Sequence, residues 1–366
     1  MFDSYTLPSG VTLKNRLILA PMTNFLSEED GRVSEKELTY YKRRSRGTGA
    51  VITACANVNT QGKGFDGEIG VDRDELIPGL KRLAEVIHEE GAKAILQIYH
   101  GGRMSPPHLL PDETPVSASA VPSEREGAAT PREMTAEEVS QTVEDFKQAT
   151  RRAIEAGFDG VELHGANTYL LQQFFSPHSN RRSDKWGGDV WQRMTFPLEV
   201  TEAVKQAVRE YARAPFITGY RFSPEEPHTP GITLEDTMRL VSELTEKGLD
   251  YLHISLRDFH QSSIREEGDG SSVIRQIRDQ IGADLPHVGV GEIRTKEDAE
   301  KALETVPLLA LGRELLIDPD WAVKVEKGQE DHIVTEMDME AQEELVIPEP
   351  MWSKIMSVPG WIPRKV

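Results

Sequence analysis

Eight short apolar runs, alternating with longer helical segments, constrain the fold of this 366-residue chain more than any other feature. Each run is almost continuously apolar, which is typical of parallel strands buried between helices. The runs span residues 16–22, 49–58, 93–100, 158–164, 216–222, 250–255, 287–293 and 308–314. Eight strand–helix units of this kind, spread over roughly 250–300 residues, predict an α/β protein built as a (β/α)8 barrel.

The helices between the runs carry start and stop signals, best seen at residues 135–157. Thr135 and Glu138 form a capping box, and Gly157 supplies the residue that ends the helix. The apolar stripe consists of Val139, Val143, Phe146, Ala149 and Ala153. The rival fold, an open doubly wound sheet, predicts a GxGxxG fingerprint after its first strand, and none follows residues 16–22. The barrel is therefore favoured.

Three segments lie outside the eight units. Residues 5–15 are expected to form a β-hairpin that closes the bottom of the barrel. The Pro-rich segment 101–134 follows the third strand on the side where active-site lids lie. We therefore expect one domain over residues 1–366, with a barrel core of about 15–328 and a C-terminal extension at 329–366. The aromatic residues of the extension predict that it docks, either on its own barrel or at a neighbouring subunit of a homo-oligomer.

Composition excludes several classes of protein. The formal charge of −19 argues against nucleic-acid and anionic-membrane partners, because phosphate binding requires clustered Lys and Arg. No apolar run approaches the roughly 18 residues of a membrane span, and the N-terminus lacks a signal pattern. The single cysteine, Cys55, suits a reducing compartment, so a cytoplasmic protein is expected. The ten histidines show no paired ligand spacing, so no metal site is predicted.

Polar residues gather where the predicted strands end, which is where barrel enzymes place their chemistry. In chain order they are Thr23, Thr53, Cys55, Gln97, His100, Arg103, His164, Asn167, Tyr169, Arg221 and Arg313. Taken singly, each has a structural explanation: Gln97 can satisfy a backbone group, Arg221 can form an internal ion pair, and Cys55 can fill space. Taken together they predict a polar ligand, because an unpaired buried charge is costly.

Glycines after the last two strands predict a phosphate site. Gly289, Gly291 and Gly312 allow the backbone to approach a ligand closely, and Arg313 adds a guanidinium. Across the barrel mouth, Gln97 offers an amide and Arg221 offers a second guanidinium. The expected ligand therefore has a phosphate at one end and a planar hydrogen-bonding ring at the other. Flavin mononucleotide (FMN) has that shape.

The chain resembles the Old Yellow Enzyme (NADH:flavin oxidoreductase) family. The similar segments are NRLILAPMT (15–23), LQIYHGGR (96–103), ELHGANTYLLQQFFSPHSNRRSDKWGG (162–188), GYRFSP (219–224), VGVGEI (288–293) and LGRELLIDPDW (311–321). The pattern H-x-x-N-x-Y, followed by S-P-x-x-N-x-R-x-D-x-aromatic-G-G, is specific to the family and nearly complete here. The resemblance is to the single-domain branch, since one cysteine cannot hold the cluster of the larger iron–sulfur relatives.

The resemblance implies an FMN site and assigns its contacts. The residues implied to bind FMN are Ala20, Pro21, Met22, Thr23, Cys55, Gln97, Arg221, Gly291, Gly312 and Arg313. Thr23 would lie near flavin O4 and tune the electron affinity of the ring. Gln97 would bind the pyrimidine edge, and Arg221 would lie by N1 and O2, where negative charge gathers on reduction. Gly291, Gly312 and Arg313 would hold the phosphate.

The resemblance also implies the catalytic residues. His164 and Asn167 would donate hydrogen bonds to a substrate carbonyl, in the manner of an oxyanion hole, so that the β-carbon accepts hydride from the flavin. Tyr169 would deliver a proton to the α-carbon. Phe25 occupies a position where some relatives place a substrate-contacting tyrosine, and Thr168 replaces a glycine common in the family.

The sequence therefore predicts an FMN-dependent ene-reductase that works by a ping-pong mechanism. NADH or NADPH would reduce the flavin, and a small electrophile, an α,β-unsaturated carbonyl or nitro compound, would then take the hydride. Three alternatives stay open: a flavin oxidoreductase whose acceptor is a quinone or another electrophile, a non-catalytic flavin-binding redox protein, and a flavin-free barrel aldolase or hydrolase.

Overall fold

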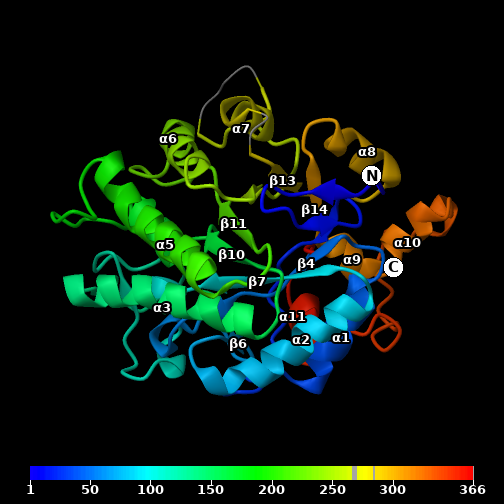
Figure 1. Ribbon diagram of the computed structural model, residues 1–366, viewed down its shortest axis with the longest axis horizontal. Coiled ribbons are helices and arrows are strands. Elements are labelled where there is room, and N and C mark those ends of the chain that lie inside the picture. The colour runs from blue at the N-terminus through cyan, green and yellow to red at the C-terminus, as the bar shows by residue number, and fades with distance from the viewer. Residues whose placement is uncertain (266–269, 283–284, 366) are drawn as a thin grey trace.

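Eight parallel strands close into a barrel in the computed structural model, which describes residues 1–265, 270–282 and 285–365 (Figure 1). The strands are β3 (Leu17–Leu19), β4 (Ala50–Ile52), β7 (Lys93–Tyr99), β10 (Gly160–Gly165), β11 (Ile217–Phe222), β12 (Tyr251–Ile254), β13 (His287–Val290) and β14 (Leu308–Leu311). Each pairs in parallel with the next, and β14 pairs with β3 to complete the ring. Each strand falls within its predicted run, except that β10 continues one residue further, to Gly165, and the predicted (β/α)8 barrel is confirmed.

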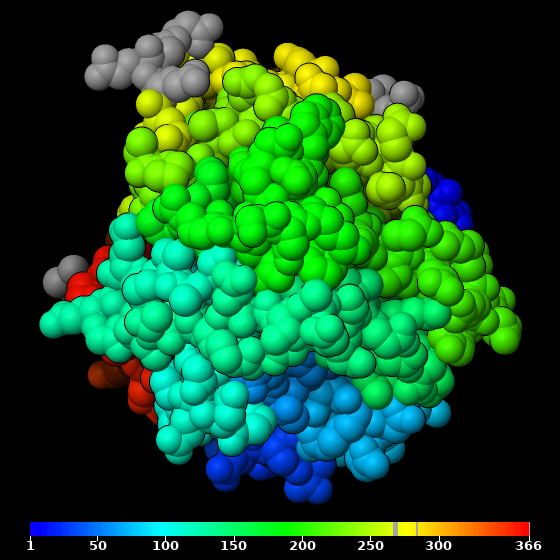
Figure 2. All heavy atoms as spheres, turned by 90° about the vertical axis from the view of Figure 1, so that its left-hand side faces the viewer, coloured from blue at the N-terminus to red at the C-terminus, as the bar shows by residue number. Residues whose placement is uncertain are grey.

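Helices surround the strands and bury their apolar faces against them. They are α1 (Glu35–Ser45), α2 (Ile77–Glu89), α3 (Ala136–Glu155), α5 (Val190–Tyr211), α6 (Leu234–Thr245), α7 (Val273–Ile281), α8 (Lys296–Leu303), α9 (Arg313–Ile317) and α10 (Trp321–Glu326). The capping box of α3 forms as predicted, with both hydrogen bonds between Thr135 and Glu138 present. Figure 2 shows α3 and α5 as adjoining teal and green bands that cover one side of the molecule. No helix in the described part of the chain combines the length and apolarity that a membrane crossing requires.

Four predicted strands end at least three residues earlier than expected, and at two of them, β4 and β14, the difference moves polar residues of the barrel mouth out of the sheet. After β4 the chain turns at residues 53–55 and then forms β5 (Ala56–Asn57), which pairs with β7 and with β6 (Ile69–Gly70). β14 ends at Leu311, and Arg313 is the first residue of α9. The polar residues at these ends therefore lie on turns that leave the sheet.

The N-terminal hairpin closes the bottom of the barrel, as predicted. β1 (Tyr5–Thr6) pairs antiparallel with β2 (Thr12–Leu13). Leu7, Val11 and Leu13 are buried in one cluster with strand residues of the barrel interior. The backbone N–H of Ser9 donates a 2.7 Å hydrogen bond to Asp250, just before β12. The opposite end of the barrel is thereby left for the site.

The segment 101–134 lies against the loop that follows β10. It contains two short 3₁₀ turns (Gly102–Met104 and Pro107–Leu109) and a parallel pair of strands, β8 (Val116–Ser117) and β9 (Arg132–Glu133). The buried guanidinium of Arg182 donates to the carbonyl oxygens of Ala118 and Met134, at 3.1 and 2.6 Å. Arg182, in the arginine-rich loop of the family pattern, therefore holds segment 101–134 in place through these hydrogen bonds.

The C-terminal extension docks on the barrel of its own chain. Its helix α11 (Met351–Met356) buries Met351 and Ile355. The fully buried guanidinium of Arg44, on α1, donates to the carbonyl oxygens of Leu345 and Val346, at 2.7 and 3.1 Å. The prediction that the extension docks is confirmed, and a contact with a neighbouring subunit stays a prediction.

Candidate active site

Nine of the residues named from the sequence line one narrow cleft at the carboxyl ends of the strands. The cleft has a volume of about 60 Å³ and is lined by Pro21, Met22, Thr23, Cys55, Gln97, His164, Asn167, Tyr169 and Arg221. Two larger cavities, of about 480 and 650 Å³, adjoin it and share Pro21, Met22 and Arg221 with it. Residues from five different strand ends therefore meet around one continuous space.

His164, on β10, presents a neutral imidazole with a defined tautomer. Its Nδ1 accepts a hydrogen bond from the backbone N–H of Ala166 at 3.3 Å. Burial, together with the charge of Arg221, holds the pKa of His164 well below its ordinary value of 6.5. A neutral ring whose Nδ1 is an acceptor carries its proton on Nε2, so His164 acts as a hydrogen-bond donor through Nε2.

Asn167 is held in a strained backbone conformation by its neighbours. Its φ is 55° and that of Thr168 is 69°, in the left-handed region that β-branched residues rarely adopt. The Asn167 N–H donates to Ser223 Oγ at 2.9 Å, and the Thr168 N–H donates to Gln172 Oε1 at 2.9 Å. Threonine therefore fits where the family often has glycine because these hydrogen bonds offset the strain.

Backbone strain concentrates around the cleft. Six non-glycine residues of the described chain have a positive φ. Four of them, Phe25, Asn167, Thr168 and Glu292, lie within or beside the lining of the cleft and the cavities that adjoin it. Strain of this kind costs about 1–3 kcal/mol per residue and is common at functional sites.

Tyr169 precedes the short helix α4 (Leu170–Phe175) and packs edge-on against two rings. Its ring centroid lies 4.9 Å from that of His164 and 4.9 Å from that of Tyr99. Burial raises the pKa of the Tyr169 phenol well above 10, so the hydroxyl stays protonated at neutral pH. The Tyr99 hydroxyl in turn donates to the buried carboxyl of Glu68, and burial raises the pKa of Glu68 to about 8.

Gln97 is held by Glu162, a residue that the sequence reasoning missed. Gln97 Nε2 donates to Glu162 Oε1 at 2.7 Å, and the carboxylate also binds Tyr251 and His253, at 3.0 and 2.9 Å. Burial would raise the pKa of Glu162, but His253, Arg221 and Gln97 together lower it. The only sequence signal was an acidic residue inside an otherwise apolar strand.

Arg221 and Cys55 differ in what they can offer a ligand. The Arg221 side chain is 8% exposed, and its Nε has no hydrogen-bond partner among the described residues. A buried guanidinium whose Nε–H has no partner in the described chain can donate a hydrogen bond to an electron-rich edge of a ligand. Burial raises the pKa of the Cys55 thiol well above its ordinary value, so Cys55 is a packing residue and not a thiolate nucleophile.

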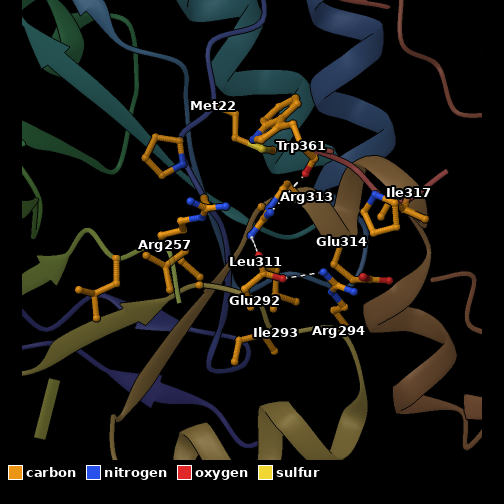
Figure 3. A pocket seen from close by; sticks show the side chains of 18 of the residues that line it. Met22, Arg257, Glu292, Ile293, Arg294, Leu311, Arg313, Glu314, Ile317 and Trp361 are labelled. Atoms are coloured by element: carbon orange, nitrogen blue, oxygen red, sulfur yellow. Dashed lines mark hydrogen bonds and ion pairs between the residues drawn. The ribbon is translucent and has the colours of Figure 1, made fainter. Parts of the chain in front are cut away.

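The predicted phosphate region lines the 480 Å³ cavity (Figure 3). Arg313 Nη2 lies 2.6 Å from Glu292 Oε1, and Arg294 Nη2 lies 2.7 Å from Glu292 Oε2. Arg313 also donates to the carbonyl oxygen of Trp361 at 3.2 Å. The sequence did not anticipate that an acidic residue would share this region with the two arginines.

The three glycines of this region have different roles. Gly291 has a φ of 128°, and a Cβ there would lie 2.8 Å from the backbone N of Phe259, so the position requires glycine. Gly312 lines the cavity, and a Cβ there would meet nothing closer than Met22 Sδ at 3.4 Å. Gly289 does not line it: a Cβ there would meet the Phe259 ring at 2.5 Å. Gly289 therefore makes room for core packing, and its role at the phosphate stays a prediction.

One group of residues in the described chain has the composition of a metal site. The ligand atoms of Glu124, His178 and His228 lie within 4.8 Å of one another. The two imidazole rings are stacked, with centroids 4.2 Å apart and planes inclined by 27°. Ring nitrogens bind metals in the plane of the ring, so nearly parallel rings do not direct both lone pairs at one ion.

Comparison with known proteins places the chain in a family. The model of the NADH:flavin oxidoreductase / NADH oxidase family matches residues 1–332. A probable NADH-dependent flavin oxidoreductase, YqiG, of Bacillus subtilis is 47% identical over 366 residues, which cover 100% of this chain and 98% of the relative. NADPH dehydrogenase of the same organism is 36% identical, covering 88% of this chain and 93% of the relative.

Two further comparisons define how far the similarity extends. NADH:fumarate oxidoreductase of Klebsiella pneumoniae is 46% identical over 96% of this chain, but these residues make up only 38% of that protein. A solved structure of morphinone reductase superposes with a TM-score of 0.77 at 29% identity and covers 89% of both chains. The chain therefore belongs to the Old Yellow Enzyme (NADH:flavin oxidoreductase) family, and it is an NAD(P)H-dependent flavin oxidoreductase.

Proposed function

We propose that this protein is an FMN-dependent ene-reductase, which takes hydride from NADH or NADPH and reduces the C=C bond of α,β-unsaturated carbonyl or nitro compounds. The observation that carries the proposal is the convergence of two neutral donors, His164 and Asn167, with the protonated phenol of Tyr169 around one cleft. Flavin binding alone does not require this set, so a non-catalytic flavin protein and a flavin-free barrel enzyme are less well supported.

The residues around the cleft fit FMN. The unpartnered Nε of Arg221 suits the N1 and O2 edge of the ring, where negative charge gathers. Gln97 is fixed by Glu162 through Nε2, which leaves its Oε1 to accept from a ring N–H. The 480 Å³ cavity beside the cleft contains Gly312 and Arg313 for the phosphate. FMN, when bound, supplies a ring that accepts hydride from the nicotinamide and passes it to the acceptor.

The chain's own residues would polarise and protonate the substrate. His164 and Asn167 donate to the carbonyl or nitro oxygen and stabilise the charge that develops there. Tyr169 gives its phenolic proton to the α-carbon, and its raised pKa keeps that proton available throughout the neutral range. The nicotinamide uses the same cleft before the acceptor does, which gives ping-pong kinetics.

A second candidate function is electron transfer from NAD(P)H to a quinone or another electrophile. Two relatives favour it, NADH:fumarate oxidoreductase and NADH:acrylate oxidoreductase. The residues that match this chain make up only 38% and 35% of the length of those two proteins. The named reductions can therefore take place in the parts of those relatives that have no counterpart here.

One experiment separates the candidates. The purified protein is loaded with FMN, reduced by NADH under anaerobic conditions in a stopped-flow instrument, and then mixed with an enone, a nitroolefin or a quinone. Rapid flavin reoxidation by the enone, with formation of the saturated ketone, supports the ene-reductase. Reoxidation by the quinone alone supports the second candidate, and the absence of flavin reduction by NAD(P)H contradicts both.

A further inference from the structure

The 650 Å³ cavity above the cleft is formed jointly by the barrel mouth and the C-terminal extension. The barrel contributes Thr23, Phe25 and Asn167, and the extension contributes Met351, Lys354 and Ile355. Lys354 lies beyond residue 332, where the family model ends. A ligand held at Asn167 therefore extends toward residues that belong to this chain and not to the family pattern.

The lining of this cavity carries only positive charge. Arg221, Arg257 and Lys354 line it, and none of the described residues in its lining is Asp or Glu. The chain as a whole has 61 acidic and 42 basic residues, so a cation-only lining is contrary to its average composition. Arg257 lies where this cavity meets the one drawn in Figure 3 and lines both.

Arg257 and Lys354 are not neutralised by any residue in the part of the chain that the structure describes. Neither forms an ion pair or a side-chain hydrogen bond with any residue in the described ranges, whereas Arg313 and Arg294 share Glu292 at 2.6 and 2.7 Å. The ammonium of Lys354 lies 5.5 Å from the ring centroid of Phe25, which holds it over the mouth of the cavity. Both side chains are exposed, and two cations on one rim attract anions from solution.

We propose that Arg257 and Lys354 form an anion-binding rim of the active site, which recognises a phosphate or carboxylate group on the ligand whose reactive end lies at His164 and Asn167. This inference rests on the proposed function and deepens it by naming the charge class of the ligand. Two ligands can supply the anion: the pyrophosphate of the nicotinamide dinucleotide, or a carboxylate on the acceptor.

The test uses FMN-loaded protein and pairs of ligands with and without the anion. Arg257→Ala, Lys354→Ala and the double variant are compared with Lys81→Ala, which removes an exposed lysine on α2. The reductants are NADH and the neutral 1-benzyl-1,4-dihydronicotinamide, and the acceptors are 4-carboxycinnamaldehyde and neutral cinnamaldehyde. Stopped-flow absorbance gives an apparent Kd in each half-reaction, and FMN content is measured for every variant because Arg257 also lines the cavity that we assign to the FMN phosphate.

Each single variant should weaken binding of the anionic ligand by about 2–5-fold, as expected for an exposed charge pair, and added salt should shrink the effect. Selective weakening of NADH supports the proposal with pyrophosphate as the anion. Selective weakening of 4-carboxycinnamaldehyde supports it with a carboxylate. Equal effects on charged and neutral ligands, or no difference from Lys81→Ala, overturn it. Reduction of wild-type flavin by the neutral reductant, followed by its reoxidation by neutral cinnamaldehyde, tests the proposed function separately, since neither reaction involves the rim.

Discussion

The hydroxyl of Ser255, just after β12, donates a 3.1 Å hydrogen bond to the Oδ1 of Asn167, just after β10. An amide whose oxygen is engaged in this way presents its NH2 group on the other side. Together with the Nδ1 contact that fixes the His164 tautomer, this bond determines that both side chains are donors. Two donors and no acceptor suit the oxygen of a carbonyl or nitro group.

Ser255→Ala should weaken this donor without removing it. The amide then rotates more freely, and we expect reduction of an enone to slow by roughly 3–10-fold, less than the 10²–10³-fold typical of losing an oxyanion-hole donor. His164→Ala and Asn167→Ala should each have a larger effect, and both should also weaken nicotinamide binding. Single-turnover rates with one enone measure all three variants. An effect of Ser255→Ala equal to that of Asn167→Ala would contradict the positioning role.

Tyr169→Phe should separate the two half-reactions. Flavin reduction by NAD(P)H requires no carbon protonation and should be nearly unchanged, whereas enone reduction should slow by about 10²–10⁴-fold. Quinones need no carbon protonation and should be reduced at the wild-type rate. If flavin reduction slowed as much as enone reduction, Tyr169 would be a structural residue.

Arg313→Ala and Glu292→Gln should change FMN affinity in opposite directions. Removing the guanidinium loses a charge-assisted contact of about 1.5–3 kcal/mol, so FMN should dissociate more readily. Glu292→Gln removes a negative charge that lies 2.6 Å from Arg313 and should tighten binding by roughly 2–5-fold. Fluorescence titration of the flavin-free protein with FMN measures both, and unchanged affinity in Arg313→Ala would exclude Arg313 from the site.

Glu37 should make stability depend on pH. Burial raises its pKa from 4.5 to about 7 in the folded protein, in spite of hydrogen bonds from Ser27 and Asn24. Between pH 4.5 and about 7 the folded state binds more protons than the unfolded state, so this contribution to the free energy of unfolding falls as pH rises. The loss is on the order of 3 kcal/mol and is nearly complete above about pH 7.

The check is the pH dependence of the melting temperature in wild type and Glu37→Gln. The variant does not titrate at this position, so the wild type should lose stability relative to it as pH rises from 5 to 8. A constant difference between the two proteins over that range would show that Glu37 is ionised in the folded state.

Truncation after Gln329 should destabilise the barrel itself. It removes the carbonyl oxygens of Leu345 and Val346 that accept from the fully buried guanidinium of Arg44. Arg44 then keeps only the carbonyl oxygen of Tyr40, at 3.4 Å, and removing partners of a buried charge costs about 3–5 kcal/mol, so the melting temperature should fall clearly. Arg44→Met in the truncated chain should recover part of the loss, and equal stability of full-length and truncated protein would contradict this account.

The sequence alone determined the barrel and most of the cleft. Strand and helix periodicity repeat eight times, and in a parallel barrel every strand ends at the same face. Polar residues at strand ends, such as Gln97 and His164, must therefore meet even when they are 67 positions apart. The capping box of α3 could also be predicted from the sequence, because Thr135 and Glu138 interact within a single turn.

Only the tertiary structure decided how these side chains are used. Glu162 faces inward toward Gln97 and His253 because of strand register, which periodicity in an apolar strand does not reveal. Glu292 reaches the site from a strained turn within the family-like segment VGVGEI, and Lys354 reaches it from the docked extension. The alternation of strands and helices that specifies the barrel is a local property of the sequence, so the sequence predicted where the site lies. Contacts between distant segments depend on packing, so the sequence did not predict the site's balance of charge.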